Sequence, residues 1–328
     1  MSVRPARLLV ASALALAALG APVASATAHV PSARSVATIT LKPATLDRGA
    51  GPAIPRVLGT TIVDGDLRIP IAAQEVQLFG MSGGDYVAGV WRRNGTARVE
   101  RIATDGARLT IMDHIRGELS LSRDGQQIFQ VFSRRAPVTV VNVRDAYTGD
   151  RLASRIFRGY VQVLDADAGR AVLGAARPTR TFWWNTGTDR ARRISDREGY
   201  FADIPADRIG TFTGGPRKRF CSVVAPLSAP HQTLWRSCRQ AVIASSPNGR
   251  RFLTVFIQGD GPFGKVSVHG GHGRLIVSYR SPGAFEGEAW ETNHTVLLTT
   301  YGIKKSAIVR CQVDVCERAT ELIDGWGR

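Results

Sequence analysis

Lysine and long apolar runs are both scarce in this 328-residue chain, and these shortages narrow the classes to which it can belong. Beyond residue 26, no apolar stretch is continuous enough to form a membrane helix, which needs about 20 residues. No long segment repeats its apolar residues every 3.6 positions, which argues against a helical protein. Glycine is frequent, with 34 residues, and the apolar runs are short. We therefore expect an all-β fold made of many short strands.

The first 26 residues have the pattern of a secretory signal peptide. Arg4 and Arg7 precede an apolar run at 8–19, and small residues follow at 24–26. A membrane anchor is the alternative interpretation, but the apolar run is short of the ~20 residues that a span requires. We expect removal of residues 1–26 and a secreted or extracytoplasmic protein of the cell envelope, without a membrane span.

Two turn segments repeat along the chain. Ser-Arg-Asp-Gly at 122–125 and Ser-Pro-Asn-Gly at 246–249 are each followed by two polar residues and an apolar one. Weaker copies with glycines at 84, 169 and 210 give intervals of 41, 44, 41 and 39 residues. A second turn, with glycines at 65, 106, 149 and 187, recurs at similar spacing. A period near 40 residues indicates a propeller or a solenoid.

One repeat shows the arrangement of strands. Residues 118–121, 128–132, 138–143 and 151–157 are expected to form four consecutive strands separated by turns. Four strands in each repeat are typical of a propeller blade. A linear stack would need polar caps at its ends, which the sequence does not show.

The number of blades follows from counting the repeats. Six complete units run from about 74 to 323, whereas 56–71 supplies only two outer strands of another, which a strand at 35–41 could complete. We predict seven blades with an irregular first one, and six blades with an added hairpin as the alternative. The domains are then a signal peptide (1–26), an N-terminal segment (27–54) and a β-propeller (55–328).

The Ser-x-Asp/Asn-Gly turn before a strand resembles the WD40-like, TolB-type propeller repeat of secreted and periplasmic bacterial proteins. The resemblance extends over most of the mature chain and is specific at the turns 122–125 and 246–249. No Trp-Asp dipeptide closes any blade, which departs from the WD40 pattern. The resemblance implies a scaffold that binds proteins, sugars or peptides, and that catalyses reactions in some members through appended domains.

The four cysteines indicate two disulfides in an exported chain. Of the three possible connectivities, their positions favour Cys221 with Cys238 and Cys311 with Cys316, each closing a hairpin within one blade. A zinc site made of four thiolates is the alternative, but the spacing does not match paired C-x2-C knuckles.

The charge is strongly basic and is carried almost entirely by arginine. The formal net charge is +16, and only five of the 43 basic residues are lysine. An arginine-rich surface would attract anionic polymers of the cell envelope, and the dense cluster Arg217, Lys218 and Arg219 is the candidate contact. The alternative is a compositional bias with arginines spread over solvated blade edges, where they discourage edge pairing.

Three other motifs are better explained by structure than by catalysis. The G-x-S-x-G pattern around Ser82 lacks the following helix of a hydrolase nucleophile elbow. His269 and His272 could present two imidazoles to a metal, but no third ligand is evident. Trp183 and Trp184 face opposite ways in a strand, so one should pack between blades and the other could form a stacking platform for a sugar or a base.

No acid, base or nucleophile constellation is evident, and we expect no catalytic, cofactor or metal residues. The predicted function is a secreted, non-enzymatic and monomeric β-propeller scaffold that binds a protein or glycan through a ring face. One alternative is a hydrolase or lyase whose site is assembled across blades in the propeller funnel. The other is a protein that binds polyanions of the cell envelope.

Overall fold

The structure is a computed structural model that describes residues 37–214, 220–259 and 261–324. Within these residues the chain forms 28 β-strands and one short 3-10 helix, η1 (Pro43–Thr45), and it contains no α-helix. The expected signal peptide at 1–26 lies outside the described residues. The all-β fold class is confirmed.

The first five sheets follow the chain in order, and all are antiparallel. The first sheet has three strands: β2 (Arg56–Leu58), β3 (Thr61–Asp64) and β4 (Leu67–Pro70). The second and third sheets have four strands each: β5 (Glu75–Ser82), β6 (Asp85–Trp91), β7 (Ala97–Ile102) and β8 (Arg108–Met112), then β9 (Glu118–Leu121), β10 (Gln127–Arg135), β11 (Val138–Asp145) and β12 (Arg151–Arg158). The fourth and fifth also have four: β13 (Tyr160–Asp167), β14 (Arg170–Ala176), β15 (Arg180–Asn185) and β16 (Arg190–Ser195), then β17 (Gly199–Asp203), β18 (Arg208–Phe212), β19 (Ser222–Ala225) and β20 (Trp235–Ser237).

The remaining strands form one nine-stranded sheet. Its main path is β21 (Gln240–Ser245), β22 (Arg251–Phe256), β23 (Phe263–Gly270), β24 (Leu275–Trp290), β25 (Val296–Tyr301), β26 (Lys305–Gln312) and β27 (Val315–Arg318). The 16-residue strand β24 pairs with β23 through its first half and with β25 through its second half. It therefore ends one four-stranded unit and begins the next, so the described strands agree with seven blades.

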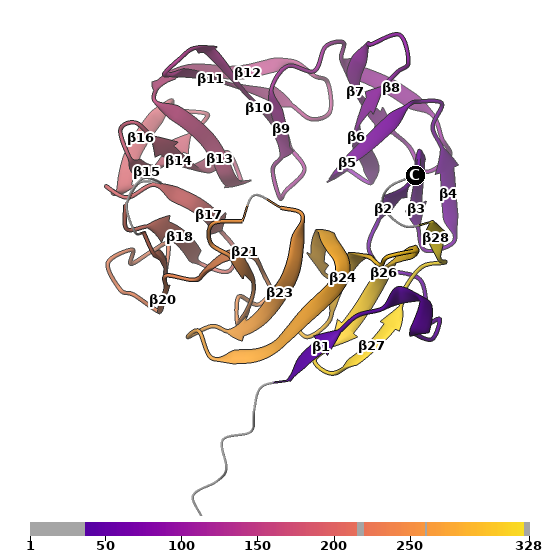
Figure 1. Cartoon of the computed structure of the whole chain (residues 1–328). Helices are drawn as coiled ribbons and strands as arrows, with labels where there is room; N and C mark the ends of the chain where they lie inside the picture. The colour runs from indigo at the N-terminus through magenta and orange to yellow at the C-terminus, as the bar shows by residue number, and fades with distance from the viewer. Residues whose placement is uncertain (1–36, 215–219, 260, 325–328) are drawn as a thin grey trace, which may run out of the picture. The chain divides into compact units, whose positions relative to one another are not determined.

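The four-stranded sheets are arranged around a centre that their first strands, β5, β9, β13 and β17, border (Figure 1). Neighbouring sheets contact one another through these strands, as β5 does with β9 and β13 does with β17. We call the end of the sheets at which these inner strands begin the entry rim. The opposite end, where turns join each inner strand to the second strand, is the turn rim.

The second strand of each blade is buried on both faces. In β14, Val172 and Leu173 are both fully buried, but they belong to different hydrophobic clusters. Because successive side chains of a strand point to opposite faces, one residue contacts the preceding sheet and the other contacts the following sheet. Full burial of one such side chain stabilises the fold by about 1.5–3 kcal/mol. Because these clusters lie between neighbouring sheets, the contacts between blades supply most of the core.

The N-terminal strand lies elsewhere than predicted. β1 (Thr38–Thr40) pairs in parallel with the first half of β24, and it does not join the sheet of β2–β4. Leu41, which follows β1, is fully buried in the cluster formed by the last two blades. The segment 56–71 also supplies three strands rather than the two expected. Among the strands that the structure describes, the first blade is therefore irregular because no inner strand joins its sheet.

The chain after β1 is fixed to the last blade by Arg310 of β26. Its guanidinium donates to both carboxylate oxygens of Glu291, at 2.6 and 2.8 Å, and to Glu317 at 2.8 Å. The same guanidinium donates to the carbonyl oxygens of Ala50 and Gly51, at 2.9 and 2.7 Å. These contacts join the segment that leads into β2 to the last blade.

Glu291 completes this connection. Its carboxylate also accepts a hydrogen bond from the backbone N–H of Ala53 at 2.6 Å, and its side chain is only 6% exposed. The hydrogen bonds from Arg310 lower the pKa of Glu291 and keep it ionised. Both charges are thus compensated within the protein, as a poorly hydrated ion pair requires.

The two repeated turns have the same geometry. The buried Ser122 hydroxyl donates to Asp124 at 2.6 Å and accepts from the N–H of Gln127 at 2.8 Å. Ser246 makes the corresponding bonds to Asn248 and Arg251, at 2.9 and 3.0 Å. Each hydroxyl thus replaces backbone partners at the start of the second strand.

The glycine of these turns lies against the preceding blade. Gly125 has φ +69°, and a Cβ there would lie 2.3 Å from the carbonyl oxygen of Met81. Gly249 has φ +64°, and a Cβ there would lie 2.7 Å from the Cβ of Ala206 and 3.2 Å from its carbonyl oxygen. Gly210 does not occupy an equivalent turn, because it lies within β18 and Asp207 takes the left-handed conformation instead, with φ +54°.

The structure joins the predicted cysteine pairs. Cys221 and Cys238 flank the hairpin of β19 and β20, and Cys311 and Cys316 lie opposite each other in β26 and β27. Each bond therefore closes a hairpin within one blade. No free cysteine occurs among the described residues.

Alanine at Gly125 tests the packing of the turn against the preceding blade, with Gly84→Ala as the matched control. Gly84 also has positive φ, but no atom lies within 4 Å of the position that a methyl group would take there. We expect Gly84→Ala to lower the free energy of unfolding by about 1–2 kcal/mol through backbone strain. Gly125→Ala should cost about 1–3 kcal/mol more, because its methyl group collides with backbone. Equal losses in denaturant melts would contradict the inter-blade contact.

Glu291→Gln tests the attachment of the first blade to the last. At neutral pH we expect a loss of about 3 kcal/mol in unfolding free energy, because Arg310 keeps a poorly hydrated charge without its counter-ion. The pKa of Glu291 in the folded protein lies below its unfolded value of about 4.3. Its contribution to the free energy of unfolding is therefore complete above about pH 4.3, the unfolded pKa, and is lost as the pH falls through the folded pKa.

The difference between Glu291→Gln and wild type should therefore narrow in acid, which denaturant melts at several pH values can measure. The control is Glu321→Gln, which removes an exposed carboxylate paired with Arg48. An exposed pair contributes less than about 1 kcal/mol, so this variant should stay close to wild type. A difference for Glu291→Gln that is constant across the acid range would refute the role of the charge.

Candidate functional site

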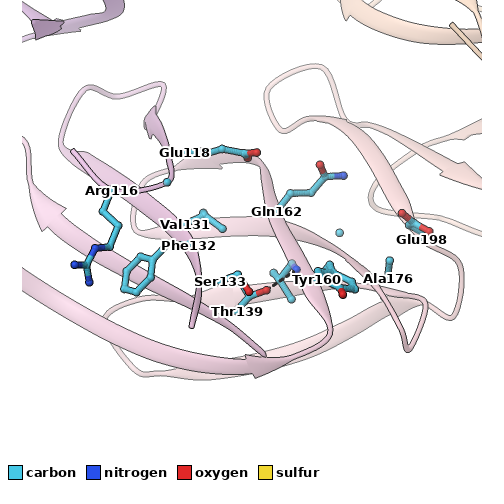
Figure 2. Close-up of a pocket in the computed structure, with 13 residues that line it drawn as sticks. Arg116, Glu118, Val131, Phe132, Ser133, Thr139, Tyr160, Gln162, Ala176 and Glu198 are labelled. Carbon is cyan, nitrogen blue, oxygen red and sulfur yellow. Dashed lines mark hydrogen bonds between the residues drawn. The ribbon is translucent and has the colours of Figure 1, made fainter. Parts of the chain in front are cut away.

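A cavity of about 570 Å³ opens at the entry rim between the blades of β9–β12 and β13–β16 and reaches the start of β17. Its side chains come from the beginnings of three successive inner strands and from β10 (Figure 2). The residues on which the chemistry depends are Arg116, Glu118, Phe132, Tyr160, Gln162 and Glu198. The repeat places them together, because each blade begins its inner strand at the same rim.

Aromatic rings occupy one side of this cavity and engage the nearby arginines. The guanidinium of Arg116 lies over the ring of Phe132 at 5.8 Å, and that of Arg177 lies over Tyr160 at 5.9 Å. Figure 2 shows Arg116 directed toward Phe132 and away from Glu118. The arginines thus border the cavity, while its inner side is left to carboxylate and amide groups.

Two glutamates supply the negative charge. Glu118 is the exposed first residue of β9, and the half-buried Glu198 directly precedes β17. Within the described part of the chain, neither carboxylate has a cationic partner. Burial raises the pKa of Glu198, because the charged form loses hydration without compensation.

An amide lies between the two carboxylates in Figure 2. Gln162 of β13 donates from Nε2 to the carbonyl oxygen of Gly199 at 3.2 Å. This bond orients the amide and leaves its oxygen for a donor from outside. The cavity therefore offers acceptors for cationic and N–H groups, together with an aromatic surface.

Glutamate recurs at the inner strands of other blades. Glu75 is the first residue of β5, and Glu288 lies in the second half of β24, where burial raises its pKa. Glu75, Glu118 and Glu198 thus place carboxylates at the entry rim of a chain whose net charge is +16, whereas Glu288 lies nearer to the turn rim. These residues were not predicted from the sequence, although aligning the repeats at their inner strands would have shown glutamate at the first position of both β5 and β9.

A second group of charged residues lies at the turn rim and serves the contacts between blades. Nε of Arg123 donates to both oxygens of Asp165 at 2.8 Å, and the same guanidinium lies 3.3 Å from Asp203. Asp203 in turn accepts from the hydroxyl of Ser245, and Asp165 accepts from the N–H of Ile204 at 2.6 Å. The group connects four successive inner strands or their turns.

These turn-rim carboxylates do not have the free acceptors that acid–base catalysis requires. Burial raises the pKa of Asp165, although the hydrogen bonds from Ile204 and Arg123 act in the opposite direction. A raised pKa alone would indicate a catalytic acid. Here the carboxylate is held by neighbouring blades, which favours a structural role.

The other residues singled out from the sequence have separate positions. Arg217, Lys218 and Arg219 lie outside the described residues, so the polyanion contact stays a prediction. Ser82 is 3% exposed and ends β5, where a second strand follows. His269 is buried, with Nδ1 3.0 Å from the carbonyl oxygen of Gly273.

Over the ranges described, no group of three or more histidine, cysteine, aspartate or glutamate side chains is placed to hold a metal ion. Nor does any helix in those ranges have the length and apolar character to cross a membrane. Among the described residues of the entry rim, no set that would hold a cofactor is apparent.

Comparison with known proteins shows the fold. No family model matches the chain, and no curated protein matches it. A structure from a study of two prolyl endopeptidases resembles it with a TM-score of 0.57 and 11% identity, over 78% of this chain and 43% of that one. The acylaminoacyl peptidase of Pyrococcus horikoshii has a TM-score of 0.54 and 10% identity, over 80% and 47%. TolB of Acinetobacter baumannii has a TM-score of 0.41 and 13% identity, over 67% and 62%.

The chain spans less than half the length of either peptidase. At these low identities the likeness concerns the fold alone, and it carries neither activity nor substrate. The β-propeller that the repeated turns and the resemblance to the WD40-like, TolB-type repeat predicted is confirmed.

Proposed function

We propose that this chain is an extracytoplasmic, non-enzymatic β-propeller that binds a polypeptide segment carrying positive charge at its entry rim. The observation that carries the proposal is the cavity in which Glu118 and Glu198 lack cationic partners among the described residues, beside Phe132 and Tyr160. A lysine or arginine of a partner would supply the missing counter-charge. The aromatic rings would contact its methylene groups.

The size of the cavity favours a short segment rather than a broad surface. A volume of about 570 Å³ lies within the range of sites that take peptides or small molecules, roughly 300–1,000 Å³. The side-chain oxygen of Gln162 and the carboxylates can accept hydrogen bonds from the main-chain N–H groups of an extended peptide. Charge and backbone recognition would then act together.

The basic charge of the rest of the chain makes the entry rim the preferred contact for a cationic partner. A cationic partner is repelled by most of the arginine-rich surface and attracted where carboxylates gather. Glu198 strengthens this preference, because a bound cation would replace the hydration that its carboxylate has lost. The free energy needed to remove water from this carboxylate has already been spent in the unbound protein, so binding does not have to supply it.

The two disulfides support an extracytoplasmic location, since such bonds persist in oxidising compartments. The predicted signal peptide at 1–26 points the same way. A hydrolase that uses Glu118 and Glu198 as an acid–base pair is the competing function, and the same experiment distinguishes it.

A short lysine-containing peptide, and the same peptide with glutamate in place of lysine, test the proposal by calorimetry near physiological salt. We expect the lysine peptide to bind wild type and to bind the Glu118→Gln/Glu198→Gln variant about tenfold or more weakly, because the counter-charges are lost. The glutamate peptide should bind wild type more weakly than the lysine peptide does, and the double variant should not weaken its binding further, because the substitutions remove repulsion. The matched control is Glu321→Gln, whose carboxylate lies away from this cavity and pairs with Arg48.

Two outcomes would overturn the proposal. One is equal affinity of wild type and the double variant for the lysine peptide, or no binding to wild type. The other is cleavage of the peptide in mass spectra, provided that Glu198→Gln abolishes it, which would assign a hydrolase.

A further inference from the structure

A second cavity, of about 500 Å³, lies between the blade of β13–β16 and the blade of β17–β20. It opens at the turn rim, because its residues are at the end of β15, the beginnings of β14 and β16, and the turns of the following blade. It shares no lining residue with the entry-rim cavity. The two surfaces can therefore be tested separately.

One wall of this cavity is a face of the sheet of β14, β15 and β16. Arg170, Asn185 and Arg190 lie opposite one another in register across the three strands. The next row on the same face is formed by Val172, Trp183 and Arg192, two residues further along each strand. Strand geometry thus brings three guanidinium groups and one indole to a single face.

Trp183 positions part of this charge. The guanidinium of Arg170 lies over its ring at 5.4 Å, a contact that restricts the arginine before any ligand arrives. The neighbouring Trp184 points to the opposite face, is fully buried and donates from Nε1 to Asp189 at 2.9 Å. This outcome matches the prediction that the two tryptophans have different environments.

The facing wall belongs to the next blade and carries a fixed carboxylate. Asp207 accepts hydrogen bonds from both the N–H and the hydroxyl of Ser228, each at 2.7 Å. Ile204 and Leu227 form the apolar part beside it. The cavity therefore combines three positive groups, one negative acceptor and a hydrophobic base.

The arginines of this face are available to a ligand. Within the described ranges, Arg170, Arg190 and Arg192 make no salt bridge and donate no side-chain hydrogen bond to a protein oxygen. Arg193, whose side chain faces the other way on the same strand, is paired with Asp196 at 2.7 Å. Arg193 is thus neutralised by a carboxylate, whereas no carboxylate of the described residues neutralises Arg190 or Arg192 on the cavity side of the same strand. This difference indicates that the positive charge in the cavity is left for a ligand.

We propose that this cavity binds an acidic saccharide, a sugar that carries a carboxylate or a sulfate. Arginine forks match the paired oxygens of these groups, and Arg190 and Arg192 would hold the acid. Asp207 and Asn185 would accept hydrogen bonds from sugar hydroxyls. The apolar face of the sugar ring would pack against Trp183 and Leu227.

The carboxylate of Asp207 argues against a phosphate polymer. A nucleic acid brings closely spaced charges along its length, which Asp207 would repel, whereas a saccharide offers hydroxyl donors between its acid groups. The volume also suits a fragment of two or three sugar rings, being within the roughly 300–1,000 Å³ of known ligand sites.

Calorimetry with a galacturonic acid trisaccharide tests the inference, using its methyl ester as the uncharged form and a sulfated trisaccharide as a second acid. We expect the acid forms to bind wild type, and the Arg190→Gln/Arg192→Gln variant to bind them about tenfold or more weakly, because the paired hydrogen bonds are lost. The methyl ester should lose a similar factor on wild type. Arg193→Gln is the control and should stay within about twofold, since it removes one of the strand's positive charges from the face that lies away from the cavity.

Binding of the uronate, the sulfated sugar or both, with this pattern of variants, supports the site and identifies the acid group that it takes. Equal binding of acid and ester, equal losses for Arg193→Gln and the double variant, or no binding of either acid would overturn it. Tighter binding of single-stranded DNA of similar length, lost in the same double variant, would also overturn it and assign a phosphate site. None of these results changes the expectation for the lysine peptide at the entry rim.

Discussion

The guanidinium of Arg310 joins the two ends of the described chain, and the arrangement of the blades depends on this junction. It binds the carboxylates of Glu291 and Glu317 in the last blade and the carbonyl oxygens of Ala50 and Gly51 in the segment that leads to the first. Because neighbouring sheets pack face to face, a propeller without this connection would expose the facing surfaces of its terminal sheets. The parallel pairing of β1 with β24 adds a second link at the same end of the fold.

With its ends joined, the repeat creates two different rims. The inner strands begin at the entry rim, where glutamates recur, and they end at the turn rim, where Arg123, Asp165 and Asp203 connect neighbouring blades. At the turn rim the opposite charges satisfy one another and hold the sheets. At the entry rim, the described structure gives Glu118 and Glu198 no such partners. The same scaffold thus uses paired charge for stability and unpaired charge for recognition.

Much of the fold could be predicted because its signals are local. The Ser-x-Asp/Asn-Gly turns at 122–125 and 246–249 require a buried hydroxyl and a glycine, and both requirements are visible in a few residues. The hairpin that brings Cys311 opposite Cys316 is equally local. The prediction that Gly210 forms the turn was wrong. The residue with positive φ there is Asp207, and aspartate adopts this conformation less often than glycine does.

The features that could not be predicted depend on residues far apart in the chain. Nothing near Thr38–Thr40 indicates that this strand pairs with β24, which lies in the last third of the sequence. The entry-rim cavity likewise combines residues from three blades, each unremarkable alone. One of Trp183 and Trp184 was predicted to form a platform, but which one it is and which arginines lie beside it follow only from the register of β14, β15 and β16.

The central claim is that the entry rim is the surface that recognises a cationic polypeptide. Hydrogen–deuterium exchange of the whole protein, with and without a saturating lysine-containing peptide, tests it most directly because it locates the contact without any substitution. We expect slower exchange at the beginnings of β9, β13 and β17 and between β10 and β11. Protection confined to the turn rim or to the outer strands, with the entry rim unchanged, would contradict it.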